Sequence, residues 1–394
     1  MTITIKKSAL LSPIFIGLLS AQAFVQSHAS AQSEDDYYEI ETLKTPKHVE
    51  LEVGGISSLP NGSIAVSTRK GQVWVIDNPH EENNKPAKFN LFASGLHEPL
   101  GMAYRDGSLY AAQRGELTRL EDTTGNGKAD IYETVFAWPL TGHYHEYSFG
   151  PKIARDGSMY VTANISFTNP LGDWWRGESY VPWRGWTMKI SPDGEMEPWA
   201  TGMRSPAGFG MIDDEFFITD NQGDWIPSGG VWHVTKGSFT GHPAGLNWTG
   251  KANSPVKLSS DTFFSSLDAR RVSKDGKAVK PENIEGEKNP ATHYQMQKAF
   301  EELKLPAVWL PHGILGVSNS EILVDKSQGD FGPFAGQAFV GDQGQSKVMR
   351  VSLEKVKGEY QGVAFDFRSG FQSGILRMDW GKPGTLFVGQ TSRG

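Results

Sequence analysis

One short pattern recurs along most of this chain, and the repetition limits the fold more than any other feature. Each copy has a strand rich in small residues, a turn carrying Gly or Asp, and a second strand of the Leu-Tyr-Val type. Short strands joined by tight turns at a recurring spacing are typical of the blades of a β-propeller. The copies are "VGGISSLPNGSIAVSTRKGQVWVID" (53–77), "PLGMAYRDGSLYAAQRGELTRLED" (99–122), "YSFGPKIARDGSMYVTAN" (147–164), and weaker matches at 206–220, 313–324 and 374–390.

Six copies predict an all-β fold, a six-bladed β-propeller spanning residues 32–394. We expect "YYEIETLK" (37–44) to supply the outer strand of the last blade. Because the sequence stops at Gly394 before a third strand of that blade appears, we expect this blade to be incomplete here and the natural chain to be longer. Residues 250–305 interrupt the repeat with a polar, partly helical insertion, which we interpret as solvated; a lid over the propeller mouth is the alternative.

The first 31 residues read as a secretory signal peptide outside the fold. Lys6 and Lys7 precede an apolar run, and Ala29-Ser30-Ala31 forms an A-x-A cleavage site, so the mature chain would start at Gln32. The apolar run is too short for a stable membrane anchor. These features predict a periplasmic or secreted protein without a membrane span in its mature part.

Two features of composition exclude whole classes of function. The chain has no cysteine, which excludes lipoproteins, thiol enzymes, iron–sulfur proteins and covalent haem carriers, and leaves stability to the core alone. The formal net charge of −7 argues against a nucleic-acid partner, which would require a basic face.

Histidines and charged residues gather just before the expected inner strands. In a propeller these positions meet at one mouth of the central channel, so we expect a shared site there. A histidine suits a general base near neutral pH, and an arginine can hold a carboxylate or stabilise a developing oxyanion. The residues in this position are His48, Glu50, His97, Glu98, His143, His145, Glu146, Arg204 and His312.

The segment "DTTGNGKADIYE" (122–133) fits a calcium-binding loop at most positions. Gly127 permits the sharp turn, and Lys128 would ligate through its backbone carbonyl. The alternative is a hydrophilic turn held by side-chain hydrogen bonds. The predicted calcium ligands are Asp122, Thr124, Asn126, Lys128, Asp130 and Glu133.

Four stretches resemble the soluble quinoprotein glucose/sorbosone dehydrogenase family over roughly residues 95–394. One is "WLPHGILGVSNSEILVDKSQGDFGPFAGQAFVGDQGQSKVMRVSLE", which resembles the family's segment that ends in a large-aromatic or basic strand. "HYHEYSFGPKIARDGSMYV" resembles its His–Phe-Gly-Pro–Asp-Gly–Tyr-Val pattern, and "GMRSPAGFGMIDDEFFITDNQGDW" is similar to its Arg-Asn-Pro-x-Gly stretch. "PLGMAYRDGSLYAAQRGELTRLEDTTGNGKADIYETV" resembles a secreted, membrane-associated branch that is often fused to a cytochrome c-type domain.

The resemblance implies a pyrroloquinoline quinone (PQQ) cofactor and a sugar or sugar aldehyde substrate. It places the catalytic base at His143 or His145 and the charge-stabilising, cofactor-binding arginine at Arg204. The family's neighbouring asparagine is Ser205 here, and its late basic pair is represented by Arg377, one residue out of register. His97 and His312 complete the candidate cofactor-binding residues.

Three functions therefore remain open. The first is an exported, PQQ-dependent sugar oxidoreductase that passes electrons to a c-type cytochrome. The second is a metal-dependent lactonase or hydrolase, for which Glu50, Glu98 and Glu146 would supply carboxylates. The third is a non-catalytic propeller that binds a carbohydrate or a protein.

Overall fold

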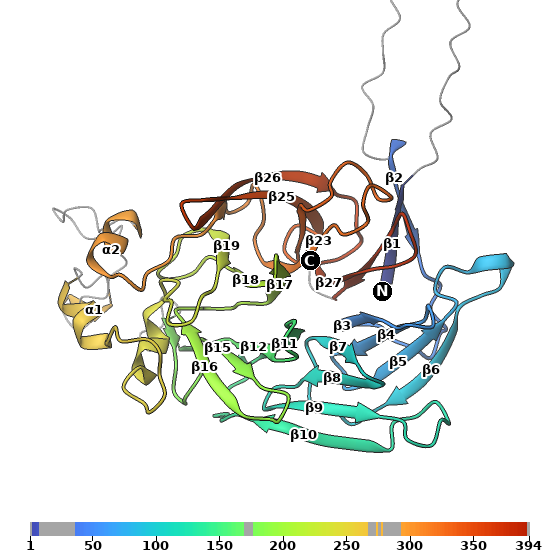
Figure 1. The fold of residues 1–394 in the computed structure, drawn as a ribbon, viewed down its shortest axis with the longest axis horizontal. Coiled ribbons are helices and arrows are strands. Elements are labelled where there is room, and N and C mark those ends of the chain that lie inside the picture. The colour runs from blue at the N-terminus through green and yellow to red at the C-terminus, as the bar shows by residue number, and fades with distance from the viewer. Residues whose placement is uncertain are drawn as a thin grey trace, which may run out of the picture.

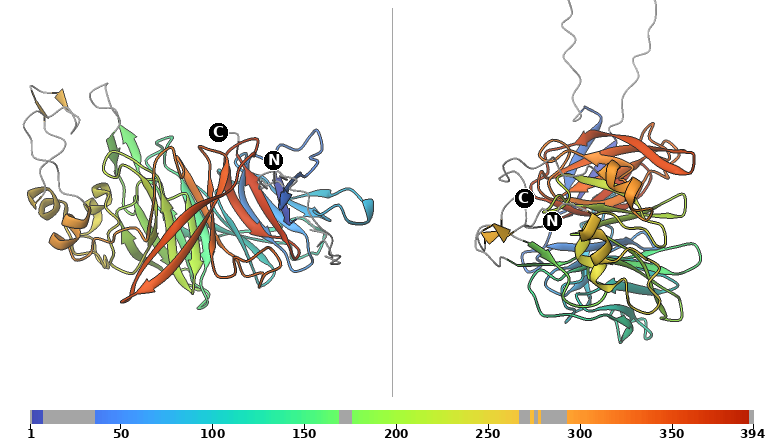
Figure 2. Two further views of the ribbon diagram at one scale, coloured as in Figure 1. Left: turned by 90° about the horizontal axis from the view of Figure 1, so that it is seen from above. Right: turned by 90° about the vertical axis from the view of Figure 1, so that its left-hand side faces the viewer.

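The structure, a computed structural model, describes residues 2–7, 36–168, 176–266, 273–274, 277–278 and 293–391. In this part of the chain, six four-stranded antiparallel sheets surround a central axis (Figure 1), which confirms the predicted six-bladed propeller. Two-stranded hairpins and short helices lie outside the six four-stranded sheets (Figure 2). The described residues contain no helix that is long and apolar enough to cross a membrane.

The strands of the first three blades, from the axis outward, are as follows. Blade one is β3 (Val53–Ser58), β4 (Ile64–Thr68), β5 (Val73–Asp77) and β6 (Lys88–Ala93). Blade two is β7 (Met102–Arg105), β8 (Ser108–Ala112), β9 (Glu116–Glu121) and β10 (Ile131–Ala137). Blade three is β11 (Ser148–Ile153), β12 (Met159–Ala163), β15 (Trp186–Ile190) and β16 (Met196–Thr201), with the hairpin β13 (Ser166–Thr168) and β14 (Arg176–Glu178) between β12 and β15.

The last three blades complete the ring. Blade four is β17 (Gly208–Ile212), β18 (Glu215–Asp220), β19 (Gly229–His233) and β22 (Val308–Leu310). Blade five is β23 (Asn319–Val324), β24 (Ala338–Asp342), β25 (Lys347–Val356) and β26 (Glu359–Arg368). Blade six is β27 (Ile375–Trp380), β28 (Thr385–Gln390), β1 (Thr2–Lys7) and β2 (Tyr38–Thr42).

The residue types explain the layers of each blade. Every residue of the second strands β4, β8, β12, β24 and β28 is buried, because these strands lie between neighbouring sheets. The inner strands need small residues where they approach one another around the axis. A Cβ atom at Gly208 in β17, for example, would collide with the carbonyl oxygen of Ser320 in β23.

The sixth blade joins the two ends of the described chain. β2 is its outermost strand, as predicted for residues 37–44, and β1 pairs with both β28 and β2. This corrects the expectation that residues 1–31 lie wholly outside the fold: residues 2–7 fill the third-strand position, where Ile5 is fully buried, while residues 8–31 lie outside the described part. The alternating pattern of Thr2–Lys7 suits such a strand. Cleavage of a signal peptide stays a prediction.

We expect Ile5→Ala in the full chain to lower the free energy of unfolding by about 2–4 kcal/mol, because the substitution leaves a cavity in the sixth blade. Urea denaturation would measure this change. The partly exposed Lys6 offers a control, since Lys6→Ala removes a surface ion pair with Glu41 and should cost under about 1 kcal/mol. An unchanged stability for Ile5→Ala would show that β1 does not contribute to the folded protein.

The described parts of the 250–305 insertion lie on the outer side of blade four, not over the mouth (Figures 1 and 2). Helix α1 (Ser260–Ser266) contributes the buried Phe263, and α2 (His293–Ala299) contributes Met296. Both side chains join the core cluster of blades three and four. This part of the insertion is therefore packed, which differs from the solvated segment predicted, and α2 confirms the expected helix. The remaining short elements are η2 (Glu82–Asn84), η3 (Pro243–Trp248), β20 (Ser273–Lys274) and β21 (Lys277–Ala278).

A buried arginine links the inner strands inside the channel. Arg377 of β27 is only 2% exposed and donates hydrogen bonds to the carbonyl oxygens of Leu100 (2.6 Å), Ala207 (2.7 Å) and Leu376 (2.9 Å). Its guanidinium also lies 3.5 Å from the carboxylate of Glu321 in β23. Burial lowers the pKa of Arg377 to about 10, against the opposing effect of Glu321, so the side chain stays charged at neutral pH. One side chain thus connects blades two, four, five and six.

We expect Arg377→Met to destabilise the protein by about 3–5 kcal/mol. The substitution leaves the buried carbonyl oxygens of Leu100 and Ala207 without their donor. It also removes one of the two cations that face the buried Glu321, whose other partner is Lys152 at 2.9 Å. The double variant Arg377→Met/Glu321→Gln should recover part of the loss. Urea denaturation of both variants and of Glu321→Gln completes a double-mutant cycle. If the losses of stability in Arg377→Met and Glu321→Gln simply add up in the double variant, the two side chains do not interact as described.

Candidate functional site

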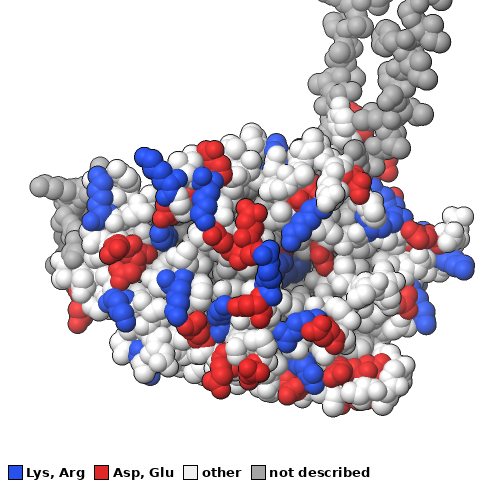
Figure 3. Space-filling view, in the orientation of Figure 1, with Lys and Arg blue, Asp and Glu red and all other residues white. Residues whose placement is uncertain are grey.

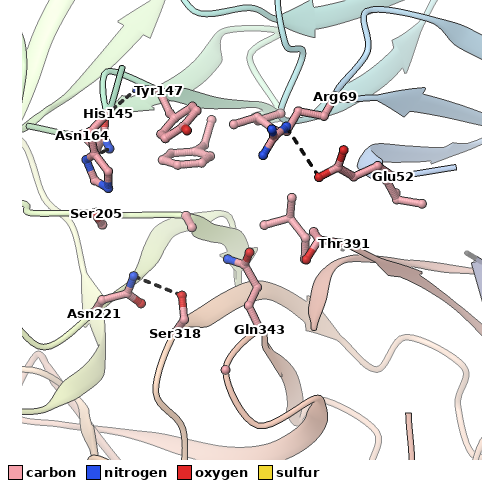
Figure 4. Close-up of a pocket in the computed structure, with 16 residues that line it drawn as sticks. Glu52, Arg69, His145, Tyr147, Asn164, Ser205, Asn221, Ser318, Gln343 and Thr391 are labelled. Atoms are coloured by element: carbon pink, nitrogen blue, oxygen red, sulfur yellow. Dashed lines mark hydrogen bonds and ion pairs between the residues drawn. The ribbon is translucent and has the colours of Figure 1, made fainter. Parts of the chain in front are cut away.

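A cavity of about 260 Å³ lies at one mouth of the central channel (Figure 4). Its wall consists of residues at the starts of inner strands and at the ends of second strands. These ends meet because the two strands of each pair are antiparallel. The lining residues are Glu52, Val53, Arg69, Leu100, His145, Tyr147, Phe149, Asn164, Ser205, Ala207, Asn221, Ser318, Gln343, Gly344, Leu376 and Thr391.

The position directly after the second strand holds a polar residue in every blade. This regularity follows from the repeat, but the predicted site was built only from residues before the inner strands and therefore missed it. Five of the six residues line the cavity, and Gln113 is the exception. The six are Arg69, Gln113, Asn164, Asn221, Gln343 and Thr391.

Of the two candidate bases, His145 lines the cavity and His143 does not. His143 instead supports its neighbour, because its Nδ1 accepts a hydrogen bond from the backbone N–H of His145 (3.1 Å). The His145 ring packs edge-on against Phe167 and Tyr147, with centroid separations of 4.3 and 5.6 Å. The structure thus favours His145 over His143 as the residue that could meet a ligand.

The surroundings of His145 Nδ1 bear on its tautomer. Nδ1 lies 3.2 Å from the carbonyl oxygen of Ile165 and 3.1 Å from Nδ2 of Asn164. The Asn164 side chain is itself fixed, because its Oδ1 accepts the backbone N–H of Tyr147 (2.6 Å). The two contacts suit different tautomers: a protonated Nδ1 donates to Ile165, whereas an unprotonated Nδ1 accepts from the amide of Asn164. The first tautomer leaves the lone pair on Nε2, which is the form a general base requires.

Two arginines hold the backbone on either side of His145. Arg114 donates to the carbonyl oxygens of Tyr144 and Glu146 (both 2.9 Å), and its guanidinium lies 4.4 Å from the centre of the Tyr147 ring. The buried Arg184 donates to the carbonyl oxygen of Tyr147 (2.9 Å). The segment that presents His145 is therefore preorganised by charge-assisted hydrogen bonds.

Glu146 is fully buried and holds the segment that carries His145 through hydrogen bonds of its carboxylate. Its carboxylate accepts hydrogen bonds from the backbone N–H of Thr141 (2.8 Å) and the hydroxyl of Ser166 (2.9 Å). Burial by itself would raise the pKa of Glu146, but these hydrogen bonds and the charge of Arg184 outweigh it and lower the pKa below its ordinary value of 4.5. Glu146 is a structural anion here and does not reach the cavity, contrary to its predicted place at the mouth.

Because the pKa of Glu146 is lowered on folding, its contribution to stability is full above pH 4.5 and is lost as the pH falls through the lowered value. We expect Glu146→Gln to cost about 1–3 kcal/mol at pH 7, since the variant keeps an acceptor but loses the charge. The difference from the wild type should shrink well below pH 4.5. Thermal unfolding at both pH values measures it, and a constant difference would contradict this role.

The other predicted site residues separate into three groups. Ser205 lines the cavity, and its role in binding a cofactor stays a prediction. His48, Glu50, His97 and His312 are exposed and lie outside its lining. Arg204 lies outside the lining, with its guanidinium 4.3 Å from the centre of the Phe167 ring. Arg377 donates to carbonyl oxygens inside the channel, so neither arginine offers its charge to the cavity as the cofactor-binding role requires. Of the predicted residues before the inner strands, only His145 and Ser205 are among the residues that line this cavity.

The charges that face the cavity come from blade one. The lining contains three ionisable residues of the Asp, Glu, His, Lys and Arg types, namely Glu52, Arg69 and His145. Arg69 Nε lies 3.5 Å from carboxylate oxygens of both Glu52 and Glu98. Glu98 in turn pairs with Arg114. The site is thus close to neutral and is dominated by amides, hydroxyls and aromatic rings.

The predicted calcium loop has the geometry of a hydrogen-bonded turn. Asp122 accepts the backbone N–H groups of Gly125, Asn126 and Gly127 and the hydroxyl of Thr124. Burial would raise the pKa of Asp122, but these hydrogen bonds lower it. At the other positions, the Asn126 side chain accepts the backbone N–H of Lys128, Asp130 accepts two hydrogen bonds from Thr123, and Glu133 pairs with Arg119 (2.8 Å).

The described residues contain no group of three or more His, Asp or Glu arranged to hold a metal ion. In the loop, the Asp122 and Asp130 oxygens are engaged by backbone and hydroxyl donors, and Glu133 faces a different partner. This arrangement matches the alternative interpretation of residues 122–133. Calcium binding by this loop stays a prediction.

Comparison with known proteins identifies the fold. An oxidoreductase (glucose dehydrogenase) from Thermus thermophilus superposes with a TM-score of 0.56 and 16% identity over 86% of this chain and 90% of that one. The PQQ-bound aldose sugar dehydrogenase of Streptomyces coelicolor gives 0.54 and 13%, over 86% and 94%. The apo-form of the soluble aldose sugar dehydrogenase of Escherichia coli gives 0.52 and 12%, over 86% and 92%.

No family model matches the chain, and no curated protein sequence matches it significantly. At these identities the structural likeness shows the fold alone. The protein has the six-bladed propeller of the soluble glucose and aldose sugar dehydrogenases, as the sequence resemblance implied.

Proposed function

We propose that the mouth cavity binds a sugar or sugar aldehyde, that the protein is an oxidoreductase of the sugar-dehydrogenase type, and that His145 is its general base. The observation that carries this proposal is the position of His145 in a cavity lined by neutral hydrogen-bonding groups. The side-chain amides of Asn164, Asn221 and Gln343 can each donate to and accept from sugar hydroxyls. Tyr147 and Phe149 offer apolar faces beside them.

In this proposal His145 takes the proton of the substrate hydroxyl through Nε2, while the hydride on the same carbon passes to a separate redox acceptor, for which the phenazine dye stands in during the assay. The contact of Nδ1 with the carbonyl oxygen of Ile165 stabilises the imidazolium that forms, and the grip of Arg114 and Arg184 on the flanking backbone holds the ring in place. General-base catalysis of this kind contributes about 10²–10⁴-fold to a rate. Export and electron transfer to a c-type cytochrome belong to the same proposal and depend on the predicted signal peptide.

The cavity does not fit the quinone implied by the family resemblance. PQQ carries three carboxylates, and such groups are held by arginine or lysine side chains in a dry site. Among the described lining residues the one Lys or Arg is Arg69, and it lies between Glu52 and Glu98. We therefore derive no catalytic step through PQQ.

The same observation favours a second candidate, a carbohydrate-binding propeller without catalysis. Such a protein would use the amide and aromatic lining for recognition, and His145 as one more hydrogen-bonding group. A metal-dependent lactonase has no comparable support, since Glu146 is buried and Glu50 is exposed outside the cavity. Substitution of His145 separates the two leading candidates.

We expect His145→Asn to lower the rate of aldose-dependent dye reduction by about 10²–10⁴-fold, while glucose binding weakens much less. Calorimetry measures binding, and reduction of a phenazine dye measures turnover. His312→Asn makes the same change at an exposed histidine outside the cavity and should leave both unchanged. Glucose binding without turnover in the wild type would select the non-catalytic candidate, and absence of both would refute the proposed function.

A further inference from the structure

We infer that the mouth cavity selects uncharged polyhydroxylated ligands against anionic ones, does not retain a tricarboxylate quinone, and owes this selectivity to Glu52. The inference rests on the proposed function in taking a sugar as the neutral ligand. It adds a specificity-determining residue and a class of excluded ligands.

The cation of the cavity already faces two anions. Arg69 Nε lies at equal distances of 3.5 Å from Glu52 Oε1 and Glu98 Oε1, so one guanidinium faces two carboxylates. An anionic ligand that approached Arg69 would meet the charge of Glu52, which lines the same wall (Figure 4). The charge of Arg69 is therefore balanced by Glu52 together with Glu98, which Arg69 shares with Arg114. Repulsion from Glu52 disfavours a further carboxylate beside Arg69.

The four other arginines near the cavity are engaged elsewhere. Arg114 forms an ion pair with Glu98 and donates hydrogen bonds to the carbonyl oxygens of Tyr144 and Glu146. Arg184 is buried beneath the His145 segment. Arg204 is packed over Phe167, and Arg377 donates to carbonyl oxygens in the channel. None of these four lines the cavity.

Apart from His145 and Tyr147, the remaining polar wall of the cavity has no ionisable side chain. Its residues come from blades three to six, and they are Asn164, Ser205, Asn221, Ser318, Gln343 and Thr391 (Figure 4). They can satisfy hydroxyl groups, but a carboxylate among them would lose its hydration without gaining an opposite charge. A neutral sugar meets complementary groups on this wall, whereas an anionic ligand does not.

The experiment uses ligands that differ in charge and little else. Glucose and glucuronate share a pyranose ring and differ by one carboxylate, and calorimetry compares their affinities for the purified full chain. PQQ is titrated separately, with its own absorbance as the readout, in the presence and absence of calcium. For the wild type we expect glucose to bind at least about 10-fold more tightly than glucuronate and PQQ to show no saturable binding.

Substitution identifies the residue responsible. Glu52→Gln keeps the size of the side chain and a hydrogen-bonding group but removes the charge, and should improve glucuronate affinity about 10-fold while glucose affinity changes less than about 3-fold. Glu50→Gln is the matched control, because Glu50 is exposed, pairs with Lys70 and lies outside the cavity. Circular dichroism confirms that both variants fold.

Saturable binding of PQQ to the wild type, or equal affinities for glucose and glucuronate, would overturn the inference. An unchanged glucuronate affinity in Glu52→Gln would overturn the role of Glu52. Failure of the proposed function is distinct from these outcomes: it would appear as the absence of glucose binding, whatever the PQQ titration shows.

Discussion

The cavity depends on a charged side chain that never reaches it. Arg377 lies inside the channel and donates to the carbonyl oxygens of Leu100 and Ala207, two residues that line the cavity. Inner strands of a propeller expose backbone acceptors to a narrow channel, and buried acceptors must be satisfied. The single guanidinium of Arg377 donates to acceptors from two other blades and so holds these blades together next to the cavity. The carboxylate of Glu321 lies 3.5 Å away and compensates the buried positive charge.

Around His145, too, charged side chains stabilise the backbone and do not line the cavity. The charged groups closest to its segment, Arg114, Arg184 and Glu146, are engaged by backbone carbonyls, a backbone N–H and a hydroxyl. Their role is to hold a loop that contains several polar residues and no regular strand of its own. The side chains left to face a ligand are mostly neutral. Around His145 the charged side chains stabilise the backbone of the site, and mostly neutral side chains line the cavity that would contact a ligand.

The mixture of acidic and basic residues elsewhere on the surface agrees with this view. On the face shown in Figure 3, Lys and Arg side chains are interspersed with Asp and Glu, and neither sign forms a continuous field. The sugar dehydrogenases named above share the propeller, yet a fold shared at 12–16% identity does not carry a binding site with it. Here the fold supplies the mouth, and the lining residues decide its chemistry.

Much of the architecture was predictable from the sequence because it arises from local patterns. Alternating strands and tight turns are encoded within about 25 residues, so the repeat itself indicated the number of blades, and the outer strand at residues 37–44 was found in the same way. Of the charged residues and histidines predicted before the inner strands, His145 is the one that lines the cavity. The polar residues after each second strand, such as Asn164 and Gln343, follow the same rule of antiparallel pairing and could have been found with it.

The sequence by itself therefore determined the propeller, its sixfold repetition and the positions that converge on its mouth. Only the tertiary structure decided which histidine lines the cavity, that Arg377 connects the inner strands, and that residues 2–7 complete the sixth blade. These outcomes depend on where distant segments place a carbonyl oxygen, a carboxylate or an open strand edge. Local periodicity describes how one segment folds, but the partner of a charged side chain is set by the packing of blades that are far apart in the chain.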